Sequence, residues 1–144
     1  MTDPYVLSIP SSIQAKMVAH CLREAPREAC GLLGGLGLDV SSFHPLRNTE
    51  TREDRYNADP DDIIRAIQRL RGRRAEIAAI YHSHPRWIAE PSRTDLARNF
   101  YGSVPRIIVS LISDPPEVRV WRLDPDSFAE IPWRIVEDSP LPQA

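Results

Sequence analysis

The segment YHSHPRWIAEPSRTD, residues 81–95, places two histidines and an aspartate at the spacing of a hydrolytic metal centre. If the apolar run before it is a strand, His82 and His84 leave the same face, because side chains alternate along a strand. Asp95 would be the third ligand. Three protein ligands leave the fourth tetrahedral position of Zn²⁺ open for a water molecule, whose pKa the ion lowers to roughly 7. The spacing therefore predicts a catalytic zinc site rather than a closed structural one.

The same segment carries a helix-start signal. Ser92 and Asp95 fit a capping box ahead of the apolar residues that follow them. This structural role is compatible with metal binding, because a capped helix start would hold Asp95 in one orientation. Two histidines at a strand end often bind nothing, so the prediction depends on all three ligands together.

A carboxylate in an unusual position lies upstream. Glu28 opens the apolar segment Ala29–Leu33, which reads as a buried strand. Burying a carboxylate without a partner is costly, and a water molecule on the predicted metal would be such a partner. The alternative is an exposed glutamate beside Arg27 at the start of a strand.

These residues fill every position of the signature E…H-S/T-H-P-x6-S-x-x-D, through Glu28, His82–Pro85, Ser92 and Asp95. On them the chain resembles the JAMM (MPN+) zinc metalloproteases, and most closely their short, free-standing bacterial members. The resemblance runs from about residue 9 to about residue 135. It implies the α/β (α+β) MPN fold, cytidine-deaminase-like, with a mostly antiparallel mixed sheet flanked by helices.

The resemblance also implies a role for each signature residue. His82, His84 and Asp95 would bind Zn²⁺. Glu28 would be the general base, and Ser92 would stabilise the tetrahedral intermediate. The substrate would be a ubiquitin-like or sulfur-carrier protein, cleaved just after its C-terminal Gly-Gly.

Two segments are candidates for binding that tail. An extended tail could add as a strand to an unpaired sheet edge. Thr51–Asn57, with Arg55 and Tyr56, is our candidate for this edge, and an ordinary surface loop is the alternative. The bulky Arg86–Ile88 loop, with Trp87, stands where the family often has glycine, and would form the second wall of a narrow groove.

Three other functions remain open. The same centre could deconjugate ubiquitin-like proteins in a bacterial antiviral system. A DNA-repair-associated protein of the RadC type usually has asparagine where this chain has Ser83. A non-catalytic MPN scaffold generally has lost ligands, and none is lost here.

Composition sets the broad class. With 144 residues, we expect one domain over residues 1–136 and a disordered tail over residues 137–144. The net charge of −2 argues against a nucleic-acid binder. No apolar run approaches a membrane span and no secretory signal is visible, so we expect a cytoplasmic monomer or homodimer. Cys21 and Cys30 lack C-x-x-C spacing and are expected to be buried.

Periodicity and turn residues predict the elements that position the site. The expected strands are Glu28–Leu36, Val40–Leu46, Ala75–Tyr81, Arg106–Ile112, Val118–Leu123 and Phe128–Val136. Expected helices run from about Ser11 to before Pro26, from Pro60 with Asp59 as its cap, and over Ser92–Asn99, while Arg47–Ala58 is a loop or irregular hairpin.

Several further residues are expected to have structural rather than functional roles. Gly34, Gly35 and Gly37 mark a turn, because the lysine and hydroxyl of a phosphate loop are missing. His20 and His44 are expected at the surface. The helix after Pro60 should bury Ile63, Ile64, Ile67 and Leu70. Its basic end either solvates the helix terminus or docks an acidic partner, and comprises Arg65, Arg69, Arg71, Arg73 and Arg74.

Overall fold

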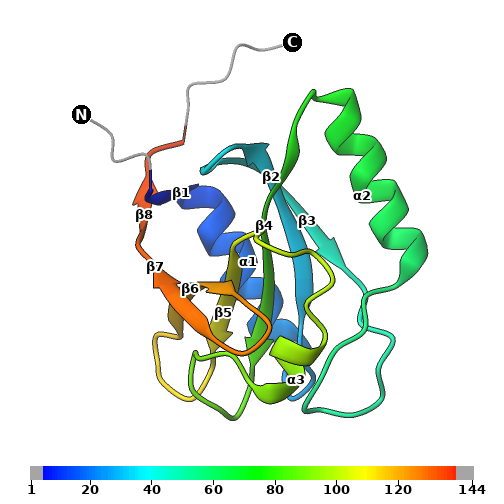
Figure 1. Ribbon diagram of the computed structural model, residues 1–144, viewed down its shortest axis with the longest axis vertical. Coiled ribbons are helices and arrows are strands. Elements are labelled where there is room, and N and C mark those ends of the chain that lie inside the picture. Colours follow the sequence, from blue (N-terminus) through cyan, green and yellow to red (C-terminus); the bar gives the residue numbers. More distant parts are fainter. Residues whose placement is uncertain (1–4, 139–144) are drawn as a thin grey trace.

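Eight strands form one mixed sheet in the computed structural model of the protein, which describes residues 5–138 (Figure 1). They are β1 (Leu7–Pro10), β2 (Cys30–Leu36), β3 (Asp39–Leu46), β4 (Glu76–His84), β5 (Arg106–Ser110), β6 (Glu117–Leu123), β7 (Phe128–Ile131) and β8 (Trp133–Val136). Their order across the sheet is β7-β6-β5-β4-β2-β3-β1-β8. Four of the seven pairings are antiparallel, which confirms the expected mostly antiparallel mixed sheet.

The last two strands differ from the sequence prediction. The sequence predicts a single strand over Phe128–Val136, but Pro132 divides it, and the halves pair at opposite ends of the strand order. Proline has no N–H for a strand ladder, and its carbonyl instead accepts from the Leu7 amide at 3.0 Å. The sheet therefore curls until its two edges approach each other, and Trp133 Nε1 in β8 donates to the Val118 carbonyl in β6 at 3.1 Å.

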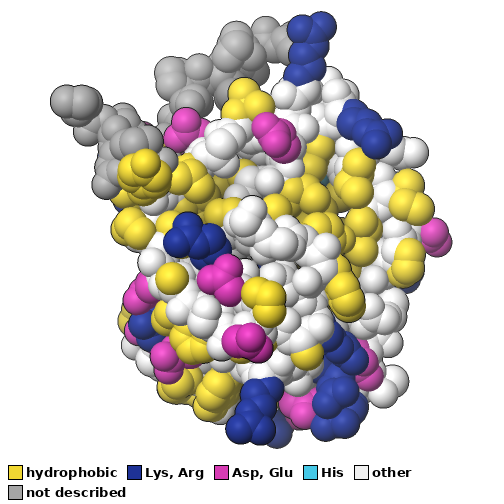
Figure 2. Space-filling model, viewed as in Figure 1, with side chains coloured by type: hydrophobic (Ala, Val, Ile, Leu, Met, Phe, Trp, Pro, Cys, Tyr) yellow, Lys and Arg dark blue, Asp and Glu magenta, His cyan; other side chains and the backbone are white. Residues whose placement is uncertain are grey.

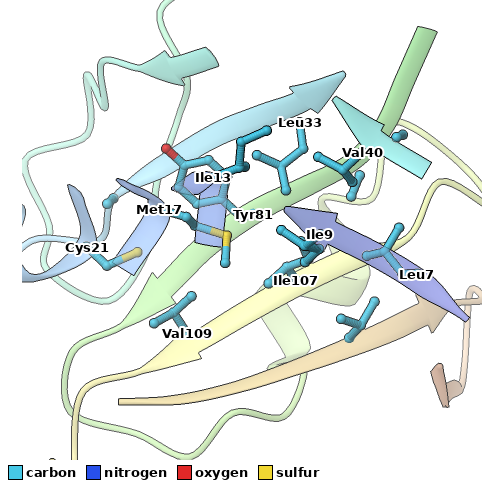
Figure 3. Close-up of a cluster of buried hydrophobic side chains, with 14 residues drawn as sticks. Leu7, Ile9, Ile13, Met17, Cys21, Leu33, Val40, Tyr81, Ile107 and Val109 are labelled. Carbon is cyan, nitrogen blue, oxygen red and sulfur yellow. The ribbon is translucent and has the colours of Figure 1, made fainter. Parts of the chain in front are cut away.

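Helices cover both faces of this sheet. Within the described part of the chain they are α1 (Ser11–Glu24), α2 (Pro60–Gly72) and α3 (Arg93–Ala97). Alternation along the central strands separates two cores. Leu33 and Tyr81 pack on the α1 side with Met17, in the cluster of Figure 3. Leu32 and Ile80 pack on the α2 side. The histidines of β4 point toward the second side, because they continue the alternation of Ile80.

Local signals predict the start of α2 correctly but not its buried face. Asp59 caps the helix by accepting from the Asp61 amide, as predicted. The expected apolar stripe is wrong in part, since Ile64 is 54% exposed and Ala66 is buried beside Leu70. Only a narrow face of α2 touches the sheet, so one side of the predicted stripe turns to solvent.

Two histidines predicted at the surface are buried. His20 Nδ1 lies 2.6 Å from the Tyr81 hydroxyl, on the inner face of α1. His44 Nε2 lies 2.8 Å from Ser42 Oγ on β3. Each imidazole has a polar partner, which allows its burial. The expected burial of Cys21 and Cys30 is confirmed.

The first and last strands of the described residues pair at one edge of the sheet. The sequence prediction lacks β1, which pairs in parallel with β8. Asp138 Oδ1 accepts from the Ser12 amide at 3.0 Å, so the fold extends into the predicted tail, and residues 139–144 lie outside the described residues. Within residues 5–138, no helix is long and apolar enough to cross a membrane.

Candidate metal centre

The end of β4 and the start of α3 bring three candidate ligands together. His82 and His84 are the last residues of β4 on the α2 side, and Asp95 is in the first turn of α3. All three side chains are buried. His82 Nε2 lies 3.1 Å from His84 Nε2 and 3.1 Å from Asp95 Oδ1, and His84 Nε2 lies 3.1 Å from Asp95 Oδ2.

The hydrogen bonding of His84 indicates which of its nitrogens is free. Its Nδ1 lies 2.7 Å from the Ile88 carbonyl oxygen, which only accepts, so Nδ1 carries the proton. In the neutral ring, Nε2 then presents a lone pair toward His82 and Asp95. Burial lowers the pKa of His82. Burial would raise the pKa of Asp95, but the two imidazoles outweigh it and hold that pKa well below its usual range.

This donor set fits a zinc ion. Two imidazole nitrogens and a carboxylate are characteristic ligands of catalytic zinc sites. Electron-pair donors that face one another at 3.1 Å repel unless a proton or a cation lies among them. Ligand atoms of all three residues lie within 4.8 Å of one another. Among the described residues, no other group of His, Cys, Asp or Glu meets this description.

Ser92 holds Asp95 in place through the predicted capping box. Ser92 Oγ accepts from the Asp95 amide at 3.0 Å, and the Ser92 amide donates to Asp95 Oδ2 at 2.9 Å. The hydroxyl proton of Ser92 is not used in this cap. Ser92 therefore remains able to donate a hydrogen bond into the site.

Glu28 lies just before β2, beside the histidines. It is 5% exposed, and its Oε1 has no hydrogen-bond partner within the described part of the chain. Burial raises the pKa of Glu28 to about 8. The expected carboxylate at the lip of a buried strand is present, although β2 begins two residues later, at Cys30.

Two residues that sequence reasoning did not select hold Glu28 in position. Ser83 lies between the histidines, and its Oγ accepts from the Ala29 amide at 2.8 Å while its own amide donates to the Ala29 carbonyl. Asn48 is buried and donates from Nδ2 to the Glu28 carbonyl at 2.8 Å. Ser83 was visible in the signature, whereas nothing in the local sequence marks Asn48.

A cavity of about 440 Å³, here called the open cleft, borders the candidate centre. It is lined by Glu28, Glu53, Asp54, His84, Pro85, Arg86, Trp87, Ser92, Arg93 and Thr94. Two loops form its walls, and the Arg86–Glu53 ion pair joins them at 2.9 Å. Both loops that the sequence predicts as walls therefore line this cleft.

The wall that follows His84 is rigidly held. Three successive carbonyls, at residues 87 to 89, accept hydrogen bonds from Ser110 Oγ, His84 Nδ1 and Trp121 Nε1. Trp87 is 46% exposed, and its ring lies 5.4 Å from that of His84. This tryptophan thus borders the cleft.

The opposite wall differs from the expected strand edge. Thr51–Asn57 contains no strand; its continuation forms only an isolated bridge between Asn48 and Ala58. Tyr56 turns inward and its ring lies 4.9 Å from the His82 ring. Arg55 and Tyr56 line a second cavity, of about 340 Å³, rather than the open cleft.

The basic end of α2 lies away from this centre. In Figure 1 the C-terminal end of α2 is at the top, and α3 is at the bottom. In Figure 2, the same view, two groups of basic side chains lie at the top right, and others lie at the bottom. The arginines of α2 beyond residue 68 therefore do not border the cleft.

A family model and several known proteins match the sequence of this chain. The family model described as prokaryotic homologs of the JAB domain matches residues 10–124. The chain is 34% identical to the CysO-cysteine peptidase of Mycobacterium tuberculosis (strain ATCC 25618 / H37Rv), over 92% of this chain and 93% of that protein. It is 38% identical to a probable TtuB-protein conjugate cleaving protease of Thermus thermophilus, over 63% of this chain and 62% of that protein.

Solved structures share the fold over nearly the whole chain. The solution structure of a protein from Desulfitobacterium hafniense superposes with a TM-score of 0.83 at 29% identity, covering 90% of this chain and 92% of that one. The crystal structure of a JAB1/MPN domain protein from Archaeoglobus fulgidus superposes with a TM-score of 0.62 at 17% identity, covering 91% and 98%.

Proposed function

Because the chain belongs to the prokaryotic homologs of the JAB domain, we propose that it is a zinc-dependent peptidase or isopeptidase acting on ubiquitin-like or sulfur-carrier proteins. Family membership and the MPN fold confirm the resemblance expected from the sequence. The proposed bond is the one after the carrier's C-terminal Gly-Gly. The names of two relatives support this choice, since one is a CysO-cysteine peptidase and the other a probable TtuB-protein conjugate cleaving protease.

The observation that carries the proposal is the buried triangle of His82, His84 and Asp95 beside Glu28, whose Oε1 has no hydrogen-bond partner among the described residues. A zinc ion held by these three side chains would supply a Lewis acid, which lowers the pKa of water and polarises a carbonyl. The groups behind the ligands support this role, because the Ile88 carbonyl orients His84 and the Ser92 amide orients Asp95.

Glu28 is the proposed general base. Its carboxylate takes a proton from the attacking water and returns it to the leaving nitrogen as the C–N bond breaks. A buried carboxyl whose pKa is raised to about 8 holds a proton readily near neutral pH, as this transfer requires. A neighbouring cation favours the carboxylate form needed for the first step.

Ser92 is the proposed oxyanion donor. Its Oγ is held by the Asp95 amide, and its proton is free to meet the carbonyl oxygen that gains charge. Trp87 and the Arg86–Glu53 pair form the walls along which an extended tail would lie. Residues without side chains fit best next to the bond that is cut, which favours glycine.

The alternative substrate is a ubiquitin-like protein linked to a lysine of another protein, as in a bacterial antiviral system. The same centre would cleave this bond. A non-catalytic scaffold is disfavoured because every candidate ligand is present and converges. Hydrolysis of a Gly-Gly-extended ubiquitin-like carrier by the purified protein, with and without a metal chelator, tests the proposal. Cleavage that a chelator abolishes and added Zn²⁺ restores supports it, and chelator-resistant cleavage contradicts it.

A further inference from the structure

The second cavity lies on the α2 side of the sheet, next to the candidate metal centre. We call it the arginine cavity, because Arg55, Arg98 and Arg106 line it together with apolar residues such as Leu32 and Ile80. Asp95 forms part of its wall, so the cavity and the candidate centre share a side chain. Thr94 lines both this cavity and the open cleft, so a ligand here would lie next to the candidate centre.

Arg106 is the unusual member of this lining. It is 2% exposed, and no carboxylate lies within ion-pair distance of it among the residues that the structure describes. Its two hydrogen-bond partners are neutral: Nη1 donates to the Tyr56 hydroxyl at 3.4 Å and Nη2 to Asn99 Oδ1 at 3.1 Å. Nε has no partner among these residues. A buried guanidinium without a counter-charge is costly, so its cavity favours an anion.

The other two arginines add to this preference. Arg98 donates to the Tyr56 carbonyl at 3.1 Å and reaches Glu50 only at 3.9 Å, while Arg55 lies 3.5 Å from Asp54. Asp95 is the one acid in the lining, and it faces the two histidines. The cavity is therefore net positive, with planar guanidinium groups that suit a carboxylate.

The volume of the cavity and the distance of Arg106 from the candidate centre limit which ligands can bind. A volume of about 340 Å³ lies near the lower end of small-molecule sites, which fits a single amino acid better than a polypeptide. Arg106 pairs with Ile80, two residues before His82. With a rise of about 3.3 Å per residue and about 4.8 Å between neighbouring strands, the backbone positions of Arg106 and His82 are roughly 8 Å apart. The Arg106 side chain lines the cavity and so extends from this position toward the centre. An α-carboxylate is only two bonds from the amine that leaves, so it is the group of the leaving amino acid that stays near the centre.

We infer that the arginine cavity binds the α-carboxylate of a single amino acid attached after the carrier's Gly-Gly, with Arg106 as its recognition residue. This inference rests on the proposed function and selects its substrate class. Water oxygen bonds to the glycine carbonyl carbon, the C–N bond breaks, and the leaving nitrogen takes a proton. The products are the Gly-Gly carboxylate and a free amino acid. A protein-linked lysine presents no free α-carboxylate near its ε-nitrogen, so the cavity favours the adduct.

The test compares two substrates that differ only in this group. A ubiquitin-like carrier ending in Gly-Gly-Ala is prepared with a free carboxylate and as the C-terminal amide. For the zinc-loaded wild-type protein we expect kcat/KM to be at least about tenfold higher for the acid, the discrimination expected when a buried charged group loses its partner. Arg106→Gln should remove most of this preference, and Arg106→Lys should restore part of it. Arg71→Gln, the same change at an exposed arginine of α2 that lines neither cavity, should leave the ratio unchanged.

A binding measurement accompanies the assay, because Arg106 is buried and its variants must be shown to fold. In NMR titrations with L-alanine and L-alaninamide, only L-alanine should shift resonances of cavity residues such as Ile80 and Tyr101, and Arg106→Gln should abolish these shifts. Equal rates on acid and amide in the wild type, or equal binding of both ligands, would overturn the inference while leaving the proposed function intact. If neither substrate is hydrolysed, the proposed function is overturned, and with it the role of the cavity in binding the leaving amino acid.

Discussion

The side-chain amide of Asn48 donates from Nδ2 to the main-chain carbonyl of Glu28 at 2.8 Å. The Oδ1 of the same side chain accepts from the amides of Glu50 and Asn57, both at 2.9 Å. One buried side chain thus joins the proposed base to both ends of the loop that forms one wall of the cleft. We expect Asn48 to position Glu28 for proton transfer without contacting substrate.

The first prediction concerns this link. Asn48→Asp keeps an acceptor for both loop amides but loses the donor to Glu28. A lost buried hydrogen bond costs about 1–3 kcal/mol, so kcat should fall at least about tenfold, with little change in KM. Steady-state kinetics measure both constants. Thr49→Val removes a hydrogen bond to the Asn57 carbonyl in the same loop and should change kcat much less. Equal effects of the two variants would mean that Asn48 acts only through loop stability.

The second prediction concerns the metal. The purified protein should contain about one zinc ion per chain, measured by elemental analysis. The reason is that His82, His84 and Asp95 supply three ligands of one tetrahedral site, whose fourth position stays open for water. The double variant His82→Ala/His84→Ala should retain almost none. Asp54→Asn, which changes an exposed acid of the open cleft, should keep its zinc. Stoichiometric zinc in the double variant would place the metal elsewhere.

The third prediction separates the two roles of Ser92. Ser92→Ala removes the hydroxyl that caps α3 and the proposed oxyanion donor. Loss of such a donor typically lowers turnover about 10²–10³-fold, and loss of a cap costs about 1 kcal/mol of stability. Ser92→Thr keeps a hydroxyl and should retain much of the turnover. Thermal unfolding measured beside kcat distinguishes the effects, and a stable, fully active Ser92→Ala would rule out the oxyanion role.

The fourth prediction concerns the tail. The Arg86–Glu53 pair joins the two walls of the open cleft, and the wall with Trp87 is fixed by three hydrogen bonds from side chains to its backbone carbonyls. Replacing Gly-Gly by Ala-Ala should therefore lower kcat/KM at least about tenfold, or 1.4 kcal/mol, because each Cβ meets a wall that does not move. Placing two alanines further from the bond is the matched control. Comparable rates on Gly-Gly and Ala-Ala tails would indicate a wide, promiscuous cleft.

Features encoded within a few residues were predictable from the sequence. The spacing of His82 and His84 along a strand, the Ser92–Asp95 capping box and the Asp59 cap each depend on local geometry alone. The convergence of His82, His84 and Asp95 was expected from their spacing and from the family signature, and the roles of the site residues remain predictions.

Features that depend on distant packing were missed. The pairing of β1 with β8 joins the first and last strands of the described residues, and the exposure of Ile64 depends on how narrowly α2 touches the sheet. Tyr56 was expected on an exposed edge, yet it packs against His82, because the intervening loop folds inward. Arg106 carries no local mark of its burial, since only the assembled sheet places it behind Tyr56.

The most direct test of the account is the turnover of zinc-loaded Glu28→Gln on a Gly-Gly-extended carrier. The substitution keeps the size of the side chain and removes only its ability to accept the proton. Equal zinc content and equal thermal stability in the two proteins show that the site is otherwise intact. We predict less than about 1% of the wild-type kcat, in line with the roughly 10²–10⁴-fold contribution of general acid–base catalysis. A variant that carries its zinc and turns over at near wild-type rate would contradict the account, because some other group would then be the base.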